Sequence, residues 1–162
     1  MRGIRMSERI DHETEAALHL FRVFSKAFKS VTDHSAAGCK IEGYNPTDFS
    51  VLEMLYHKGP QPIQQIGSKL LLQSGNVTYV IDKLERNGML RRHPCATDRR
   101  VIFAELTDKG REEMQGLFPK HSLLLKRAMS GLTLEEKKEA IQLLKKLGIQ
   151  AEKLSLVTKK GS

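Results

Sequence analysis

Apolar residues recur at helical spacing along most of the chain. From Asp11 to Ser35 they return every three or four positions, which predicts an amphipathic helix that ends before Gly38. Asn45-Pro46 then provides a capping residue and a proline at the first helical position, so a second helix is predicted up to Gly59-Pro60. Pro62 precedes a third, short helix from Ile63 to about Leu71.

A fourth helix is predicted from Ser74 to Asn87, and Gly88 ends it in the left-handed conformation. Two short strands follow, Met89 to Arg92 and Val101 to Leu106, joined by a polar loop. A long helix is predicted from Thr107 to about Ser130. The capping box that begins at Thr133 starts the last helix, whose apolar stripe reaches Leu154.

This order of elements predicts a fold that is mainly α with a small β-hairpin wing. Residues 45–107 would form a winged helix-turn-helix, and residues 11–35 and 108–156 would form the long helices that flank it. The whole of 11–162 is expected to be a single domain, preceded by a flexible arm at 1–10. The flanking helices carry more apolar surface than a small module can cover, so a homodimer of C₂ symmetry is expected.

The charge balance indicates a polyanionic partner. The 162 residues include 27 Lys and Arg against 19 Asp and Glu, a net charge of +8. This excess does not separate DNA from RNA or anionic lipid. No apolar run approaches 18 residues and the N-terminus is mixed and charged, so neither a signal peptide nor a membrane span is expected. With only two cysteines, a disulfide scaffold is excluded and a cytoplasmic protein is expected.

Two motifs give the chain a resemblance to a known family. Leu84 to Leu90 forms the exit of the fourth helix, and Asp98-x-Arg100 is followed after five residues by Leu106-Thr107. In this combination, the chain resembles the MarR (multiple antibiotic resistance regulator) family of winged-helix repressors over about residues 15–155. The phrases at 45–49, 55–59 and 97–100 are similar to members that respond to quinones and catechols. The resemblance implies a homodimer that binds a palindromic operator in double-stranded DNA and releases it when a small phenolic or quinone effector binds or when a thiol is modified.

The outward face of the fourth helix is small and polar, which favours base contacts in the major groove over an ordinary solvated surface. At the wing, Arg100 matches the characteristic arginine of the family and is expected to enter the minor groove. Asp98 is expected to hold Arg100 or to cap the turn, because phosphate repels a carboxylate, and Arg99 is expected to contact the DNA backbone. Arg91 and Arg92, at the base of the wing, are either DNA contacts or solvated strand residues. The predicted DNA-binding residues are Gln64, Gln65, Ser74, Asn76, Thr78, Tyr79, Lys83, Arg91, Arg99 and Arg100.

Candidates for sensing an effector or oxidant are few. Cys39 lies in a glycine-flanked connection beside a lysine that would favour its thiolate, and Cys95 lies among the arginines of the wing. The alternative for each is an incidental thiol. His34, Tyr44 and His57 are candidate pocket residues, or else ordinary caps and surface residues. The histidines and cysteines show no metal-binding spacing, so neither a metal nor another cofactor is expected.

Three function classes can be compared. The first is a homodimeric, ligand-responsive repressor. The second is an architectural DNA- or RNA-binding protein without sequence preference, whose binding would depend on phosphate contacts. The third is an enzyme, which the sequence disfavours because it has no glycine-rich phosphate loop, no Gly-x-Ser-x-Gly elbow and no evident carboxylate pair.

Overall fold

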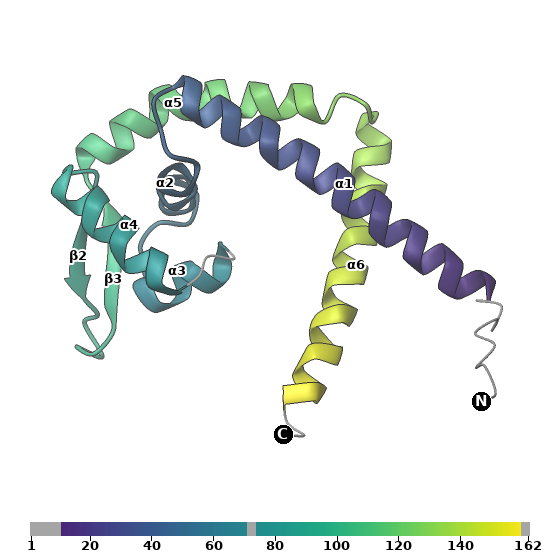
Figure 1. Ribbon diagram of the computed structural model, residues 1–162. Coiled ribbons are helices and arrows are strands. Elements are labelled where there is room, and N and C mark those ends of the chain that lie inside the picture. The colour runs from purple at the N-terminus through teal and green to yellow at the C-terminus, as the bar shows by residue number, and fades with distance from the viewer. Residues whose placement is uncertain (1–10, 71–73, 160–162) are drawn as a thin grey trace, which may run out of the picture. The chain divides into compact units, whose positions relative to one another are not determined.

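The computed structural model describes residues 11–70 and 74–159, and of residues 74–76 and 155–159 the backbone alone (Figure 1). The chain divides into two compact units, Met1–Leu125 and Lys126–Ser162, which are described separately below. The arm predicted at residues 1–10 lies outside the described residues.

In its described residues, the first unit contains five helices and three strands, and its last helix continues three residues into the second unit. Their order is α1 (His12–Ile41), α2 (Pro46–Lys58), β1 (Gln61–Pro62), α3 (Ile63–Lys69), α4 (Ser74–Arg86), β2 (Leu90–Pro94), β3 (Ile102–Leu106) and α5 (Asp108–Ala128). The second unit contains α6 (Leu134–Lys159). The predicted fold class, mainly α with a small β wing, is confirmed.

Local side-chain caps explain where two of these helices begin. The Asp11 carboxylate accepts a 2.8 Å hydrogen bond from the backbone N–H of Thr14 at the start of α1. The Asn45 side chain accepts a 2.9 Å hydrogen bond from the N–H of Thr47, and Pro46 occupies the first turn of α2. Both caps satisfy N–H groups that have no partner inside the helix.

The first helix is longer than predicted, because Gly38 does not break it. Helix α1 runs past Ser35 to Ile41, and Gly38 is one of its buried residues. A Cβ atom at this position would lie 2.3 Å from Cδ1 of Leu124. Gly38 therefore permits α1 to lie close against α5, and the chain turns only at Gly43, which has a φ of 84°.

The sheet has one strand more than predicted. The two predicted strands form an antiparallel hairpin in which Arg92 lies opposite Ala104. The short strand β1 adds to the other edge of β3, with Gln61 opposite Ala104 and Pro62 opposite Phe103, so the strand order is β1-β3-β2. A two-residue strand has no periodicity, and proline lacks a backbone donor, so the sequence pattern gives no sign of β1.

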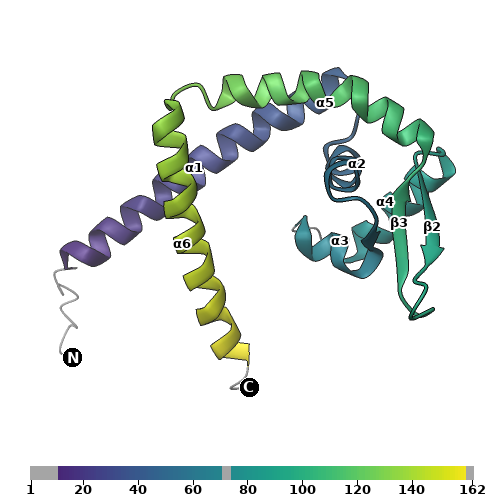
Figure 2. The ribbon, with the colours of Figure 1, turned by 180° about the vertical axis from the view of Figure 1, so that it is seen from behind.

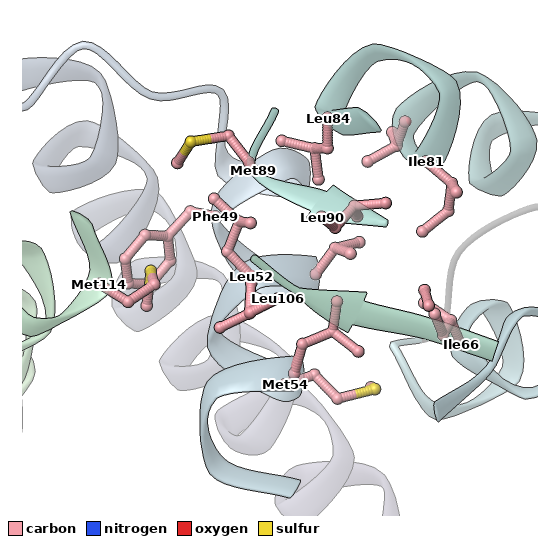
Figure 3. Close-up of a cluster of buried hydrophobic side chains, with 14 of the residues drawn as sticks. Phe49, Leu52, Met54, Ile66, Ile81, Leu84, Met89, Leu90, Leu106 and Met114 are labelled. Atoms are coloured by element: carbon pink, nitrogen blue, oxygen red, sulfur yellow. The ribbon is translucent and has the colours of Figure 1, made fainter. Parts of the chain in front are cut away.

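The core of the first unit gathers around α2 (Figure 3). Leu52 of α2, Ile66 of α3 and Ile81 of α4 are fully buried, and Leu90 and Leu106 cover them from the hairpin. Met114 brings α5 into the same cluster beside Phe49. Among the described residues, no buried side-chain nitrogen or oxygen lacks a hydrogen-bond partner. This core fixes α3, α4 and the hairpin in one module.

The second unit begins with the predicted capping box. The Thr133 hydroxyl accepts a 3.2 Å hydrogen bond from the N–H of Glu136, and the Glu136 carboxylate accepts a 2.7 Å hydrogen bond from the N–H of Thr133. The hydrogen bonds from Thr133 lower the pKa of Glu136. Helix α6 therefore has a well-defined N-terminus.

Candidate nucleic-acid interface

Helix α4 combines a buried apolar face with an exposed polar one. Val80, Ile81 and Leu84 are buried in the core, whereas Thr78 is exposed and Tyr79 keeps 64% of its surface accessible. The side chains of the predicted contacts Ser74 and Asn76 lie outside the described residues. The polar face is thus available for contact with a partner along the part of α4 that is described.

The end of α4 fixes where the wing begins. Gly88 has a φ of 70°, and its N–H donates to the carbonyl of Glu85 at 2.9 Å. The N–H of Met89 donates to the carbonyl of Leu84, also at 2.9 Å. This pair of bonds is a Schellman motif, which ends a helix within one residue and needs a glycine at the left-handed position. Strand β2 therefore leaves α4 through a single tight turn.

The first turn of α3 lies beside the exposed polar face of α4. Gln64 and Gln65 are both exposed there. Gln64 and Thr78 line one groove, to which Arg92 and Ile102 of the hairpin also contribute. Gln64 of α3 and Thr78 of α4, both predicted to bind DNA, thus border the same groove.

Lys83 does not extend freely from α4. Its ammonium lies 2.6 Å from Oδ2 of Asp48, a residue of α2 that is only 6% exposed. The hydrogen bond to this carboxylate raises the pKa of Lys83. The pair joins α4 to α2, so the predicted DNA contact of Lys83 would have to be made by an amine that already has an anionic partner.

At the tip of the wing, Arg100 is hydrogen-bonded to Asp98. The Arg100 guanidinium donates two hydrogen bonds to the Asp98 carboxylate, at 3.0 and 3.1 Å, and its backbone N–H donates a third at 3.0 Å. The Arg100 hydrogen bonds lower the pKa of Asp98. The Arg100 side chain is nevertheless 90% exposed, and Arg99 beside it is also exposed. Figure 2 shows this loop projecting beyond the helices of the module.

The two arginines at the base of the wing have different partners. Arg91 donates to Oε2 of Glu105 at 3.0 and 3.1 Å, a contact within the hairpin. Arg92 is less exposed and forms ion pairs with Asp82 and Glu85 of α4. In the structure, both arginines are therefore bound to carboxylates instead of being simply solvated.

Cys39 does not lie where the sequence suggested. It belongs to the last turn of α1, not to a loop, and is 4% exposed. Burial raises the pKa of this thiol, and the charge of Glu53 acts in the same direction. The expectation that Lys40 favours the thiolate is wrong, because the pKa of the buried thiol is raised and the exposed Lys40 is not among the causes of the shift. The sulfur lies 3.9 Å from Nδ1 of His121.

His121 was not identified from the sequence. It is 7% exposed, burial lowers its pKa, and its ring lies 4.3 Å from that of Phe49. A signal was present, because His121 continues the inward spacing of Met114 and Leu117 along α5. Cys39 and His121 line one pocket between α1, α2 and α5, together with Gly38, Ile41, Glu42, Phe49, Leu117, Lys120 and Leu124.

The other candidate sensing residues are dispersed. His34 is exposed on α1, and Tyr44 donates a 2.5 Å hydrogen bond to Glu113. Burial, together with that hydrogen bond, raises the pKa of Tyr44. The His57 ring lies 4.4 Å from that of Phe118. None of these three residues lines the pocket that contains Cys39.

Cys95 differs from Cys39 in being partly exposed in the wing loop. The hydrogen bond to the Thr97 hydroxyl lowers its pKa, and backbone donors of Thr97 and Asp98 add to this effect. The wing arginines, which the sequence suggested as a basic setting for Cys95, are not among the causes of this lowered pKa. Within the described part of the chain, no group of three His, Cys, Asp or Glu residues could hold a metal ion, and no helix is long and apolar enough to cross a membrane.

Comparison with known proteins gives one consistent result. The family model described as "MarR family" matches residues 44–102. The uncharacterized HTH-type transcriptional regulator YkoM of Bacillus subtilis is 55% identical over 144 residues, which covers 89% of this chain and 94% of that protein. The HTH-type transcriptional regulator MhqR of the same organism is 47% identical over 139 residues, covering 86% and 96%.

Solved structures show the same fold. The MarR family regulator Sco3205 of Streptomyces coelicolor, solved in complex with DNA, superposes with a TM-score of 0.72 at 21% identity and covers 91% of this chain and 90% of that one. The two Bacillus subtilis relatives of this chain are transcriptional regulators, not enzymes. The chain thus belongs to the MarR family of DNA-binding, HTH-type transcriptional regulators.

Proposed function

We propose that this protein is a homodimeric repressor that reads a palindromic DNA operator and releases it on binding a small phenolic or quinone effector. The observation that carries the proposal is that one buried core holds both an exposed polar helix face, on α4, and an arginine-tipped wing. A helix fits the major groove of B-DNA, and a guanidinium is attracted by a narrow minor groove. The two elements can therefore read neighbouring grooves of one half-site.

The proposed division of labour follows side-chain chemistry. Thr78 and Tyr79 of α4, with Ser74 and Asn76 at its start, would face base edges and the sugar-phosphate backbone. Arg100 would enter the minor groove, with Arg99 on the adjacent phosphates. Gln64 and Gln65 would donate to phosphates beside α4. The net charge of +8 would favour association with DNA before any base is read.

The proposed dimer rests on apolar side chains that each long helix leaves exposed. On α1, Phe21 is 68% exposed and Phe28 is 57% exposed. On α6, Leu143 and Leu154 are about as exposed as these. Large apolar residues at helical spacing are costly to leave in water, and a second copy would cover them. Twofold symmetry would then place two copies of α4 about 34–36 Å apart, one turn of DNA.

The proposed effector site is the pocket that contains Cys39 and His121. It is lined by elements that also form the core of the winged helix-turn-helix, so an occupant could alter the position of α4 and the wing. An effector shifts the equilibrium only if it binds the DNA-free form more tightly than the DNA-bound form. A flat ring with one or two oxygens would suit the aromatic ring of Phe49 and the imidazole of His121.

Selection from a random pool of duplex DNA, at near-physiological salt, tests the proposal. The expected product is an inverted repeat whose half-sites are about one helical turn apart. Recovery of no motif, with binding that disappears as salt is raised, would instead indicate an architectural protein that contacts phosphates alone.

The effector part has its own test on the selected operator. Release by a benzoquinone is compared with release by the corresponding hydroquinone, for the wild type and for Cys39→Ser. If quinone addition to the thiol causes release, Cys39→Ser stays on DNA with the quinone. If occupancy of the pocket suffices, Cys39→Ser is released like the wild type. No release of either protein by either compound would contradict this effector class.

A further inference from the structure

Arg92 connects the wing to the recognition helix. It lies at the centre of β2, opposite Ala104. Its guanidinium forms ion pairs with Asp82 and Glu85, which stand three residues apart and therefore on one side of α4. Glu85 also accepts a 3.1 Å hydrogen bond from the Arg92 backbone N–H. Both the side chain and the main chain of β2 are thus held to α4.

We propose that Arg92 is a positioning residue that sets the angle between α4 and the wing, so that α4 and Arg100 reach the same half-site together. The inference rests on the proposed reading of one half-site by both elements. It assigns to Arg92 neither of the roles expected from the sequence, a DNA contact or a solvated strand residue.

The geometry explains why a contact between β2 and α4 is needed near the base of the wing. Beyond α4, the hairpin is attached through the tight turn at Gly88. The five residues of β2 carry the chain about 16 Å from that turn at about 3.3 Å per residue. A rotation of about ten degrees at the base would therefore move the wing tip by about 3 Å, as much as the length of a hydrogen bond. The contacts of Arg92 oppose such a rotation.

Electrostatics argues against Arg92 as a phosphate contact. Its side chain is 28% exposed, against 90% for Arg100. Two carboxylates already share its single positive charge, and a planar guanidinium suits such forked pairing. Arg91 provides the matched comparison, because its partner Glu105 lies on β3. The Arg91 pair stabilises the hairpin internally and does not reach α4.

The first test is a double-mutant cycle on operator affinity, using Arg92→Ala and Arg100→Ala separately and together. Arg100→Ala should weaken binding about thirtyfold in the wild type but less than about threefold when Arg92 is absent, because a loose wing no longer delivers Arg100. Two independent DNA contacts would give additive losses. A purely structural effect of Arg92, corrected for the folded fraction measured by thermal melting, would also leave the cost of Arg100→Ala unchanged. Either additive result overturns the inference.

The second test changes Asp82 and Glu85, the acidic partners of Arg92. Removing these negative charges is predicted to weaken DNA binding, although loss of repulsion would strengthen it. Asp82→Asn with Glu85→Gln keeps the size of both side chains and removes two negative charges near the DNA. Loss of repulsion alone would raise affinity. The inference predicts instead about tenfold weaker binding, while Glu105→Gln, the matched control within the hairpin, binds at least as well as the wild type. Unchanged or tighter binding by the Asp82 and Glu85 variant overturns the inference.

These outcomes separate the inference from the function on which it rests. A wild-type protein that does not prefer the selected operator over random duplex would overturn the proposed function, and the inference with it. Normal wild-type preference with additive losses in the cycle overturns the positioning role of Arg92 alone.

Discussion

Similar apolar residues are buried in the reading module, residues 46–106, and exposed on the long helix α6. In the module, Leu52 and Ile81 are completely buried. In α6, Leu143 and Leu147 remain 60% and 45% exposed. The same contrast holds between the module and the exposed phenylalanines of α1. The module completes its own core, whereas α1 and α6, each taken within its own unit, leave large apolar side chains exposed.

This difference separates two sources of stability. The module is stabilised by burial within one chain and by ion pairs such as that of Lys83 with Asp48. The long helices gain their remaining stabilisation, on our proposal, from a second copy. Substitutions in the module should therefore affect folding or DNA affinity, and substitutions on the exposed faces should affect assembly.

The largest effect is expected for Leu52→Ala at the centre of the module. Removing a fully buried leucine leaves a cavity and should lower the free energy of unfolding by about 4 kcal/mol. Urea denaturation measures the loss. Tyr79→Ala, an exposed residue of α4, is the control and should change stability by less than about 0.5 kcal/mol. Equal losses for both variants would mean that the module is not organised around this core.

The next effect is expected for Phe21→Glu on α1. Two symmetry-related rings, each contributing about 1.5 kcal/mol or more, would be lost from the dimer, so its dissociation constant should rise at least about a hundredfold. Analytical ultracentrifugation measures the dissociation, and circular dichroism should show that helix content is kept. Lys26→Glu, an exposed polar position on the same helix, should leave the association unchanged. A Phe21→Glu protein that dimerises normally would remove α1 from the interface.

A smaller effect is expected for Arg100→Ala at the wing tip. Affinity for the operator should fall about thirtyfold, or about 2 kcal/mol, because one groove contact is lost. The dimer and the melting temperature should not change, since the side chain is exposed and its partner Asp98 lies in the same loop. Arg111→Ala on α5 tests whether any lost positive charge has this effect. Comparable losses for the two variants would sink the assignment of the wing to a groove.

The smallest effect concerns pH and His121. Burial lowers the pKa of this histidine in the folded protein, so below about pH 6.5 the unfolded chain binds a proton that the folded chain does not. Stability should therefore fall as the pH drops below about 6.5, by less than a factor of ten in the folding constant per pH unit. Chemical denaturation between pH 7.5 and 5.5 follows this change. His121→Gln carries no titrating ring and should flatten the dependence; an unchanged slope would assign it to other groups.

The sequence predicted those parts of the molecule whose causes are local. Asn45, Pro46 and Gly88 marked helix ends through their own caps and backbone angles. The residues of the wing turn lie within the few positions that form it, so Asp98 and Arg100 could be associated before the structure was known. The order of the predicted helices and strands gave the fold class, and the motifs at 84–90 and 98–107 gave the family.

The features that were missed depend on residues far apart in the chain. Lys83 was predicted to contact DNA, but the structure pairs it with Asp48, which lies 35 positions earlier on another helix. The extension of α1 through Gly38 depends on the nearby side chain of Leu124, and the environment of Cys39 depends on His121. Spacing along one helix contains no information on such contacts. The acidic pair on α4 before Arg92 was visible in the sequence, but its bridging role required the fold.

The most direct test of the central claim, that a self-contained module reads each half-site with helix and wing together, is hydroxyl-radical footprinting on the selected operator. In each half-site, the backbone around a central major groove and the minor groove beside it should be protected. Arg100→Ala should remove the minor-groove protection and leave the central protection in place. A wild-type footprint confined to the major groove, or one that Arg100→Ala leaves unaltered, would show that helix and wing do not read the half-site together.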